Sequence, residues 1–194
     1  GKRNHPSIVQ WTTFNEGDCW DVFTEKPYDV PGIVNLAKKL DPSRLVDTDS
    51  GGGANNLHVG DVNDIHTYPF PGDPQASKTQ YAMIGEYGGL GVFIKGKEWA
   101  PGRCYAYKPC KSSEEYAILL AGMASELQER ADHIGAVVYT QTTDLECECD
   151  GLINYDRSDK FTDFEKSMIR KANKRLATYG TNGIGDMGVV QKEN

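Results

Sequence analysis

The sequence predicts an α/β fold with a parallel, largely buried sheet, and two observations carry this prediction. Short apolar runs, typical of strands covered on both faces, alternate along the 194 residues with helices or long loops. Polar and acidic residues then gather where each of these runs ends, which is the functional edge of a parallel sheet. Five strands are expected from the sequence, whereas a closed barrel of parallel strands needs eight and typically ~250 residues.

The first half of the chain contains four of the expected strands and one helix. Asp29 is expected to cap the helix, because the apolar residues that follow it recur at helical spacing, and Asp41-Pro42 ends it. Residues 17–27 and the glycine-rich run 49–56 are expected to be loops. The expected elements are a strand leading into Glu16, a helix over 30–40, and strands over 44–47, over 62–68 and from 81 to Glu86.

The second half is expected to hold a long loop, a helix, the fifth strand and a second helix. Ser112 and Glu115 form a capping box that opens a helix reaching about His133, and Thr162 with Glu165 opens the final helix in the same way. The aromatic, glycine-rich stretch has no periodicity and is expected to be a ligand-facing loop. The loop is expected over 91–110 and the fifth strand over 135–140. Residues 1–178 are expected to form a single domain, and residues 179–194 a mobile polar tail.

Charge and hydropathy exclude several classes of partner. A net charge of −7 argues against a nucleic-acid partner, because binding phosphates requires clustered Lys and Arg. No apolar run approaches the ~20 residues that span a bilayer, so no membrane partner is expected. The first residues lack the order of charges and apolar residues of a signal peptide, and there is no initiator Met. The compartment therefore stays open, with an extracellular or periplasmic location among the alternatives.

The five cysteines give no metal template. Cys147 and Cys149 form a C-x-C pair, and the spacing from Cys104 to Cys110 is too wide for a zinc knuckle. No metal and no cofactor are therefore expected. Cys104 and Cys110 either close a small disulfide loop in an oxidising compartment or remain as thiols.

Two of the expected strands end in the same way, with a glutamate followed by glycine. Glu16 precedes Gly17, and Glu86 precedes the Gly88-Gly89 pair by one residue. Either one alone would be an ordinary surface glutamate. Two carboxylates at the same mouth of a parallel barrel, however, are the minimum equipment for glycoside hydrolysis, because one protonates the leaving oxygen while the other attacks the anomeric carbon.

Other polar and aromatic residues near the strand ends suit a sugar pocket. Asn15 could bond a sugar hydroxyl next to the reacting carbon, and His66 with Tyr68 could orient the Glu86 carboxylate. Trp99 offers an apolar face on which a sugar ring could stack. The polar cluster from Gln141 to Asp144 follows the last strand and would line the pocket.

Six segments, in this order, carry a resemblance to a known family. Together they resemble the catalytic domain of family 2 glycoside hydrolases, the β-galactosidase and β-glucuronidase relatives, over about residues 4 to 157. The segments are Asn4-His5-Pro6-Ser7-Ile8-Val9-Gln10-Trp11, Phe14-Asn15-Glu16-Gly17, Leu40-Asp41-Pro42-Ser43-Arg44, Asp64-Ile65-His66-Thr67-Tyr68-Pro69, Gly85-Glu86-Tyr87-Gly88-Gly89-Leu90-Gly91, and Tyr139-Thr140-Gln141-Thr142-Thr143-Asp144-Leu145-Glu146 leading to Gly151-Leu152-Ile153-Asn154-Tyr155-Asp156-Arg157.

The resemblance implies a (β/α)8 TIM barrel, of which this chain would cover about strands 4 to 8, and a retaining mechanism through a covalent glycosyl-enzyme. It implies that Glu16, after the fourth strand, is the acid/base and that Glu86, after the seventh, is the nucleophile. Asn15 would contact the sugar, and His66 and Tyr68 would follow the sixth strand. The implied partner is a carbohydrate substrate with a terminal β-linked sugar.

The match begins only at the fourth strand of the family's barrel, which leaves two hypotheses. In the first, the chain is the part of a β-galactosidase-like enzyme that holds both acids, and the missing strands come from another segment or chain, because unpaired apolar sheet edges would aggregate. In the second, the chain is a non-catalytic structural or carbohydrate-binding protein derived from half a barrel. Activity of the chain in isolation is a separate question that the sequence leaves open.

Overall fold

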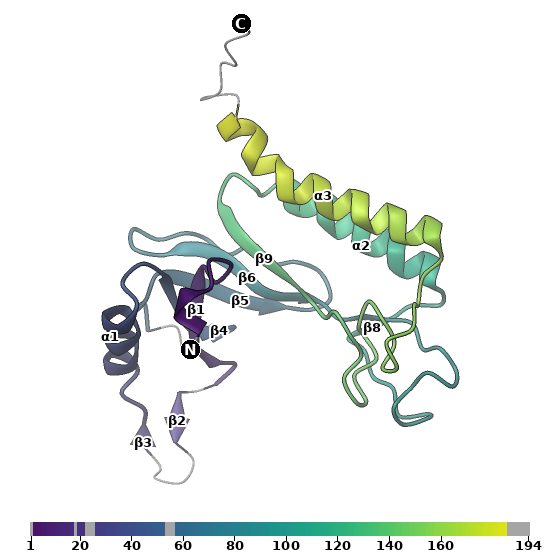
Figure 1. The fold of residues 1–194 in the computed structure, drawn as a ribbon, viewed down its shortest axis with the longest axis horizontal. Coiled ribbons are helices and arrows are strands. Elements are labelled where there is room, and N and C mark those ends of the chain that lie inside the picture. Colours follow the sequence, from purple (N-terminus) through teal and green to yellow (C-terminus); the bar gives the residue numbers. More distant parts are fainter. Residues whose placement is uncertain (1, 18, 22–25, 53–56, 186–194) are drawn as a thin grey trace, which may run out of the picture. The chain divides into compact units, whose positions relative to one another are not determined.

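The computed structural model describes residues 2–17, 19–21, 26–52 and 57–185, and divides the chain into two compact units. The first unit comprises residues 1–67, 72–86 and 133–138, and the second comprises 68–71, 87–132 and 139–194. The single domain expected over 1–178 stays a prediction, and segments of the two units alternate along the chain. Figure 1 follows the chain through its elements.

In the first unit, long strands that follow one another in the sequence are also neighbours in space. After a short 3-10 helix, Lys2–Asn4, β1 (Gln10–Asn15) pairs with β4 (Leu45–Ser50). This pair is parallel, as the sequence predicts, and Trp11 stands opposite Val46. Strand β4 contacts β5 (Val62–Thr67), which begins a sheet of order β5-β6-β9, seen side by side in Figure 1. Strand β6 spans Tyr81–Gly88 and β9 spans Ile134–Thr140.

Helix α1 (Val30–Leu40) lies against β4, and its bounds confirm the helix predicted over 30–40. The Asp29 side chain accepts a hydrogen bond from the Gly32 N–H, and the helix ends at Asp41. Capping satisfies a donor that the first turn would otherwise leave unpaired. The buried face of the helix joins a small core made of Cys19, Val30, Val34 and Val46, with Phe14 and Ala37 packed against it.

Two expected loops in this unit are shorter than the sequence suggests. The stretch from 17 to 27 contains β2 (Trp20–Asp21) and β3 (Lys26–Pro27), which form an antiparallel pair. Strand β4 continues to Ser50, past the expected end at Asp47, because its last residues pair with β1. The middle of this strand consists of three buried polar residues, Asp47, Thr48 and Asp49, so a hydrophobicity pattern does not predict that the strand continues past Asp47.

The second unit is built on a pair of packed helices, α2 (Ser113–Gln128) and α3 (Asp163–Gly185). Both expected N-termini are confirmed: the Glu115 N–H donates to Ser112 Oγ, and the Glu165 N–H donates to Thr162 Oγ1. Helix α2 ends at Gln128, five residues before the expected His133. Helix α3 includes residues 179–185, expected in the tail, while 186–194 lie outside the described residues.

The second unit also contains the aromatic stretch from 91 to 110. It is mostly irregular, as expected, and the short parallel pair of β7 (Leu90–Gly91) with β8 (Lys108–Pro109) closes it. A disulfide joins Cys104 to Cys149 and corrects the expected alternatives, since Cys110 remains a thiol. Main-chain bonds at Tyr105 bring the two segments together: its N–H donates to Cys147 and its carbonyl accepts from Cys149.

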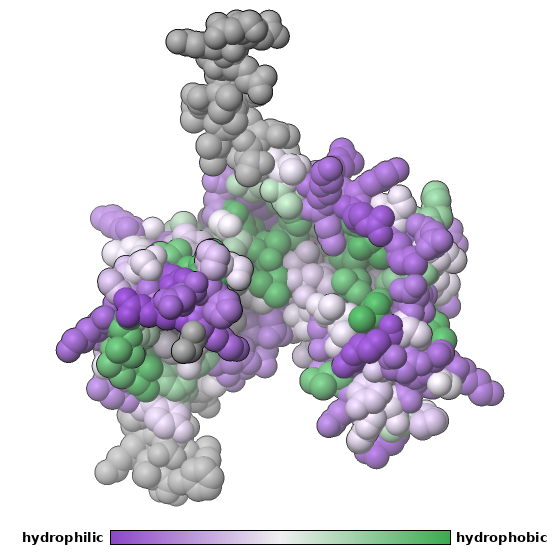
Figure 2. Space-filling view, viewed as in Figure 1, coloured by the Kyte–Doolittle hydropathy of each residue, from purple (hydrophilic) through white to green (hydrophobic). Residues whose placement is uncertain are grey.

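The face drawn in Figure 2 carries both hydrophilic and hydrophobic residues. Hydrophilic residues cover much of the surface over α3 in Figure 2. Among the described residues, no helix combines the length and the apolarity that crossing a bilayer requires.

Candidate active site

Three side chains from three strand ends of the first unit meet at one point. Glu16 directly follows β1, His66 lies near the end of β5, and Glu86 lies near the end of β6. His66 Nδ1 is 2.6 Å from Glu16 Oε1 and 3.7 Å from Glu86 Oε2. One oxygen of each carboxylate and a ring nitrogen all lie within 4.8 Å of one another. The two expected acids are therefore close together, with an imidazole between them.

Glu16 is held in an uncommon backbone conformation. Its φ is +48°, in the left-handed region that residues other than glycine rarely occupy. The Glu16 N–H donates to the Ser50 carbonyl at 2.9 Å, which anchors the turn to the end of β4. Its side chain is 52% exposed, compared with 29% for Glu86. Strain of this kind is often found at functional sites, where the surrounding structure compensates for it.

The His66 ring is buried against the main chain of Gly51. Its side chain is only 6% exposed. Gly51 has φ +71°, and a Cβ placed on it would lie 2.3 Å from His66 Cγ. Glycine is therefore required there for two reasons, its backbone conformation and the space that the ring occupies. On its far side, His66 Nε2 lies 2.8 Å from Ser50 Oγ.

Two buried carboxyl groups lie behind this histidine. Asp64 Oδ2 accepts from Ser50 Oγ at 2.7 Å, and Asp64 Oδ1 accepts from the Gly85 N–H at 2.5 Å. Asp47 lies beside Asp64 and also bonds the Thr12 hydroxyl at 3.3 Å. Burial, together with the neighbouring Asp64 charge, raises the pKa of Asp47 to about 7. Burial also raises the pKa of Asp64, although bonds from Ser50 and Gly85 oppose the shift.

The Glu16, His66 and Glu86 group is also compact enough to be considered as a cation site among the described residues. Its ligand atoms, however, already interact with one another. A cation would have to replace the proton that joins His66 Nδ1 to Glu16 Oε1 at 2.6 Å. The donor set therefore suits the transfer of a proton between an imidazole and a carboxyl group.

The other expected site residues divide between the two units. Asn15 ends β1 in the first unit, with an exposed side chain. Tyr68 belongs to the second unit, where its ring stacks on Tyr107 with centroids 3.8 Å apart and planes 6° apart. Trp99, also in the second unit, is 47% exposed and lies against Tyr155, so part of its face is accessible. Trp99, which is expected to stack on a sugar, is therefore exposed in part, and the expected roles of Asn15 and Tyr68 stay predictions.

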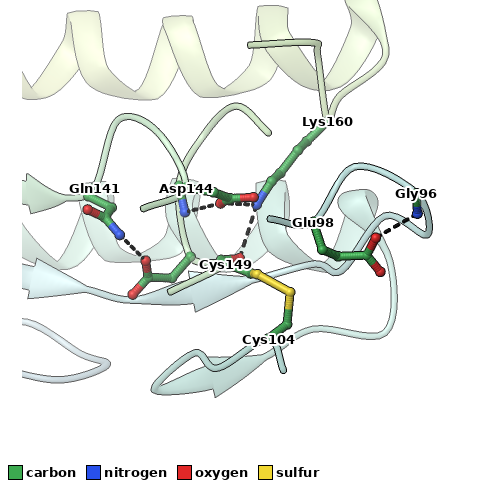
Figure 3. The surroundings of a disulfide bond; sticks show 9 residues. Gly96, Glu98, Cys104, Gln141, Asp144, Cys149 and Lys160 are labelled. Atoms are coloured by element: carbon green, nitrogen blue, oxygen red, sulfur yellow. Dashed lines mark hydrogen bonds and ion pairs between the residues drawn. A yellow bond between two sulfur atoms is a disulfide. The ribbon is translucent and has the colours of Figure 1, made fainter. Parts of the chain in front are cut away.

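The two residues expected to line the pocket after β9 are bound to partners of their own, shown in Figure 3. Gln141 Nε2 donates to Asp150 Oδ1 at 2.6 Å. Asp144 is buried and pairs with Lys160, whose Nζ lies 2.6 Å from Asp144 Oδ1 and also donates to the Cys149 carbonyl. These contacts hold the loops of the second unit together beside the disulfide. A direct contact with a sugar stays a prediction for both residues.

Ser50 and Asp64 are the site residues that sequence reasoning missed. A signal for Asp64 was present, because alternate residues of a strand share a face and Asp64 precedes His66 by two. Ser50 carried no such signal, since it was assigned to a loop. Both residues support His66, and neither is placed to touch a ligand directly on the contacts described.

Comparisons with known proteins place these residues in a family context. Residues 1–86 match the family model described as "Glycosyl hydrolases family 2, TIM barrel domain". The matched range contains Glu16, His66 and Glu86, and it confirms a fold of TIM-barrel type. No curated protein matches the chain in sequence.

Solved structures of glycosidases share the fold at low sequence identity. An FMN-binding β-glucuronidase from Faecalibacterium prausnitzii L2-6 has a TM-score of 0.56 and 19% identity, and covers 87% of this chain and 29% of its own. Another β-glucuronidase, "Faecalibacterium prausnitzii Beta-glucuronidase", has a TM-score of 0.55 and 17% identity, and the match covers 89% of this chain and 32% of that one. An exo-β-agarase has a TM-score of 0.53 and 11% identity, and the match covers 78% of this chain and 22% of that one. This chain thus spans about a third or less of the structures it matches.

Proposed function

We propose that this chain, whose resemblance to the catalytic domain of the family 2 glycoside hydrolases is confirmed, carries the two catalytic acids of a retaining β-glycoside hydrolase. The observation that supports the proposal most directly is the approach of Glu16 and Glu86 to within 4.8 Å, oxygen to oxygen. Retaining enzymes hold their two carboxyl groups ~5 to 5.5 Å apart, whereas inverting enzymes leave ~6.5 to 9.5 Å for a water molecule. The short separation favours retention.

The proposed roles follow from the surroundings of each acid. Glu16 shares a short hydrogen bond with His66, so it has a proton at hand for the leaving oxygen. Glu86 Oε2 is 3.7 Å from His66 Nδ1, farther than Glu16 Oε1, which leaves the shared proton with Glu16 and suits Glu86 to act as the carboxylate nucleophile. Assigning the acid/base role to Glu16 and the nucleophile role to Glu86 also agrees with the resemblance in sequence.

The reaction then consists of two displacements at the anomeric carbon. A Glu86 oxygen bonds to that carbon as the glycosidic carbon–oxygen bond breaks, and Glu16 gives its proton to the departing oxygen. In the second step Glu16 takes a proton from water, whose oxygen bonds to the anomeric carbon while the ester to Glu86 breaks. The net change is hydrolysis with retention, and both glutamates return to their starting states.

The five long strands are proposed to be strands 4 to 8 of the barrel. Their order supports this assignment, because β1, β4, β5, β6 and β9 are neighbours in the same order as they occur in the chain. The remaining strands would come from another segment or chain. The whole enzyme would then take a carbohydrate with a terminal β-linked sugar, with Asn15, Tyr68 and Trp99 as further sugar contacts.

A β-galactosidase-like specificity is the specific proposal for that sugar. It is tested by measuring the release of nitrophenol from aryl β-galactosides and aryl β-glucuronides with the protein and with Glu86→Gln. Hydrolysis of the galactoside that Glu86→Gln abolishes would support the proposal. Preferential hydrolysis of the glucuronide would overturn the specificity while keeping the mechanism. Binding of sugars without turnover by either protein would favour the non-catalytic, carbohydrate-binding alternative.

A further inference from the structure

We propose that Ser50 and Asp64 are positioning residues for His66. They hold the ring so that its Nε2–H donates to Ser50 Oγ, and Nδ1 then faces Glu16, with one proton shared between Nδ1 and the Glu16 carboxyl group. The contacts form a continuous chain from Glu16 through His66 and Ser50 to Asp64, with successive separations of 2.6, 2.8 and 2.7 Å. A catalytic role for this chain of contacts rests on the proposed function, whereas the hydrogen bonds are independent of it.

The direction of each hydrogen bond follows from the end at Asp64. The Gly85 N–H can only donate, and it donates to Asp64 Oδ1. Asp64 also accepts from Ser50 Oγ, so each of its oxygens has a donor, and of the two neighbouring acids Asp47 is the one that holds a proton. The single Ser50 proton is then committed to Asp64, and Ser50 Oγ can only accept from the histidine. His66 must therefore carry its proton on Nε2.

This arrangement determines what Nδ1 can do. If His66 is neutral, Nδ1 is an acceptor and the proton in its short contact belongs to Glu16. If His66 is charged, the same proton lies on Nδ1. In both cases one proton is held between the two residues, at the carboxyl group that must deliver it to a leaving oxygen. The ring also lies 3.7 Å from Glu86, so its orientation affects both acids.

Packing holds the chain of contacts in place. Gly51 leaves room for the His66 ring, and Gly85 leaves room for the Asp64 carboxyl group, which a Cβ on Gly85 would approach to 2.1 Å. Asp47, the other buried acid beside Asp64, lies against it from β4. Because these groups are enclosed, water cannot readily replace Ser50 as the partner of Nε2.

The test is the state of the His66 ring, followed by nitrogen-15 NMR of histidine-labelled protein. His66→Gln identifies its resonances among the four histidines. We expect Nε2 to be protonated in the parent protein. In Ser50→Ala the Nε2 proton should exchange with solvent at least ~10-fold faster, because one buried hydrogen bond is lost. Ser50→Thr, which keeps a hydroxyl, should restore slow exchange.

A matched control deletes a different hydroxyl bonded to the same strand. Thr13 Oγ1 donates to the Thr48 carbonyl at 2.7 Å, and Thr13→Val should leave the His66 resonances unchanged. Unprotonated Nε2 in the parent, or identical exchange in Ser50→Ala, would overturn the proposal.

Kinetics separate this inference from the proposed function. A roughly tenfold loss of kcat in Ser50→Ala with little change in KM, reversed in Ser50→Thr, would support both. Full kcat together with an unchanged His66 would reject the positioning role and leave the hydrolase intact. Control of the His66 ring by Ser50 in a protein that hydrolyses no glycoside would support the contacts and reject the catalytic proposal.

Discussion

His66 Nδ1 lies 2.6 Å from Glu16 Oε1, although fifty residues separate the two in the chain. The contact joins the end of β5 to the turn after β1, across the intervening strand β4. A side chain that is 52% exposed is thereby tied to one that is almost fully buried. In the proposed mechanism, the exposed Glu16 carboxyl group would reach the substrate while a buried imidazole shares its proton.

Glu16→Gln should separate substrates by their leaving groups. The amide cannot protonate an oxygen, so hydrolysis of an alkyl β-glycoside should fall by ~10²- to 10⁴-fold. The first step with a dinitrophenyl glycoside should change little, because that leaving group departs without a proton. Steady-state and pre-steady-state assays of both substrates check this. Glu114→Gln, an exposed glutamate in the first turn of α2, serves as the control.

Gly51→Ala should displace the imidazole and lower kcat. The added Cβ would fall 2.3 Å from His66 Cγ, and φ +71° adds strain. Gly96→Ala is a matched control, because Gly96 also has a positive φ of +83° but nothing lies within 4 Å of the added carbon. Equal activity and equal melting temperatures in the two variants would show that the ring does not need the space.

The raised pKa of the buried Asp47 predicts how the free energy of unfolding depends on pH. Its pKa rises from 3.8 to about 7 on folding, so between these values the folded state holds a proton that the unfolded state has released. The free energy of unfolding should therefore fall as pH rises through this interval and level off above it. Asp47→Asn should remove roughly 2 to 4 kcal/mol of that decline. Urea denaturation at pH 5 and pH 8 measures it, with Asp73→Asn as the exposed control.

The disulfide should stabilise the second unit substantially. Cys104 and Cys149 are 45 residues apart, and closing a loop of that length is worth ~4 kcal/mol in the chain-entropy description. Cys104→Ser with Cys149→Ser should lower the free energy of unfolding by about that amount. Cys110→Ser, which removes a thiol, should have a smaller effect. If the reducing agent dithiothreitol leaves the melting temperature unchanged, the bond contributes nothing.

The buried ion pair of Lys160 and Asp144 should be costly to break from one side. Lys160→Met leaves a carboxylate without its partner in the interior, which typically costs ~3 to 5 kcal/mol. Lys166→Met removes a partly exposed lysine that pairs with the exposed Asp159 and Asp163 and should cost ~1 kcal/mol or less. Similar chemical denaturation curves for the two variants would contradict this difference.

Local signals in the sequence predicted much of the fold. Helix caps at Asp29, Ser112 and Thr162 are recognisable because each depends on residues within one turn. The strands that end at Glu16 and Glu86 are recognisable because apolar runs give way to polar residues and glycine. Strands of a parallel sheet end at one edge, as β1 and β4 do, and this is why the approach of the two acids could be anticipated.

What the sequence could not predict depends on contacts between distant segments. Ser50 lies in the glycine-rich run 49–56, which predicts a loop, and the burial of the polar residues before it depends on distant strands such as β1. The partner of Cys104 was missed for a similar reason. It lies beyond helix α2, and main-chain bonds at Tyr105 decide the pairing rather than any local spacing.

The catalytic assignment of Glu86 can be tested directly by trapping it. The Glu86 carboxylate would bond to the anomeric carbon of a dinitrophenyl 2-deoxy-2-fluoro-β-glycoside and displace dinitrophenolate, and the fluorine would slow hydrolysis of the resulting glycosyl ester. Trypsin releases residues 79–95 as one peptide, in which Glu86 is the sole acidic side chain. We expect mass spectrometry to find the sugar on this peptide, and to find no such adduct in Glu86→Gln. Labelling of a different peptide, with hydrolysis unimpaired in Glu86→Gln, would contradict it.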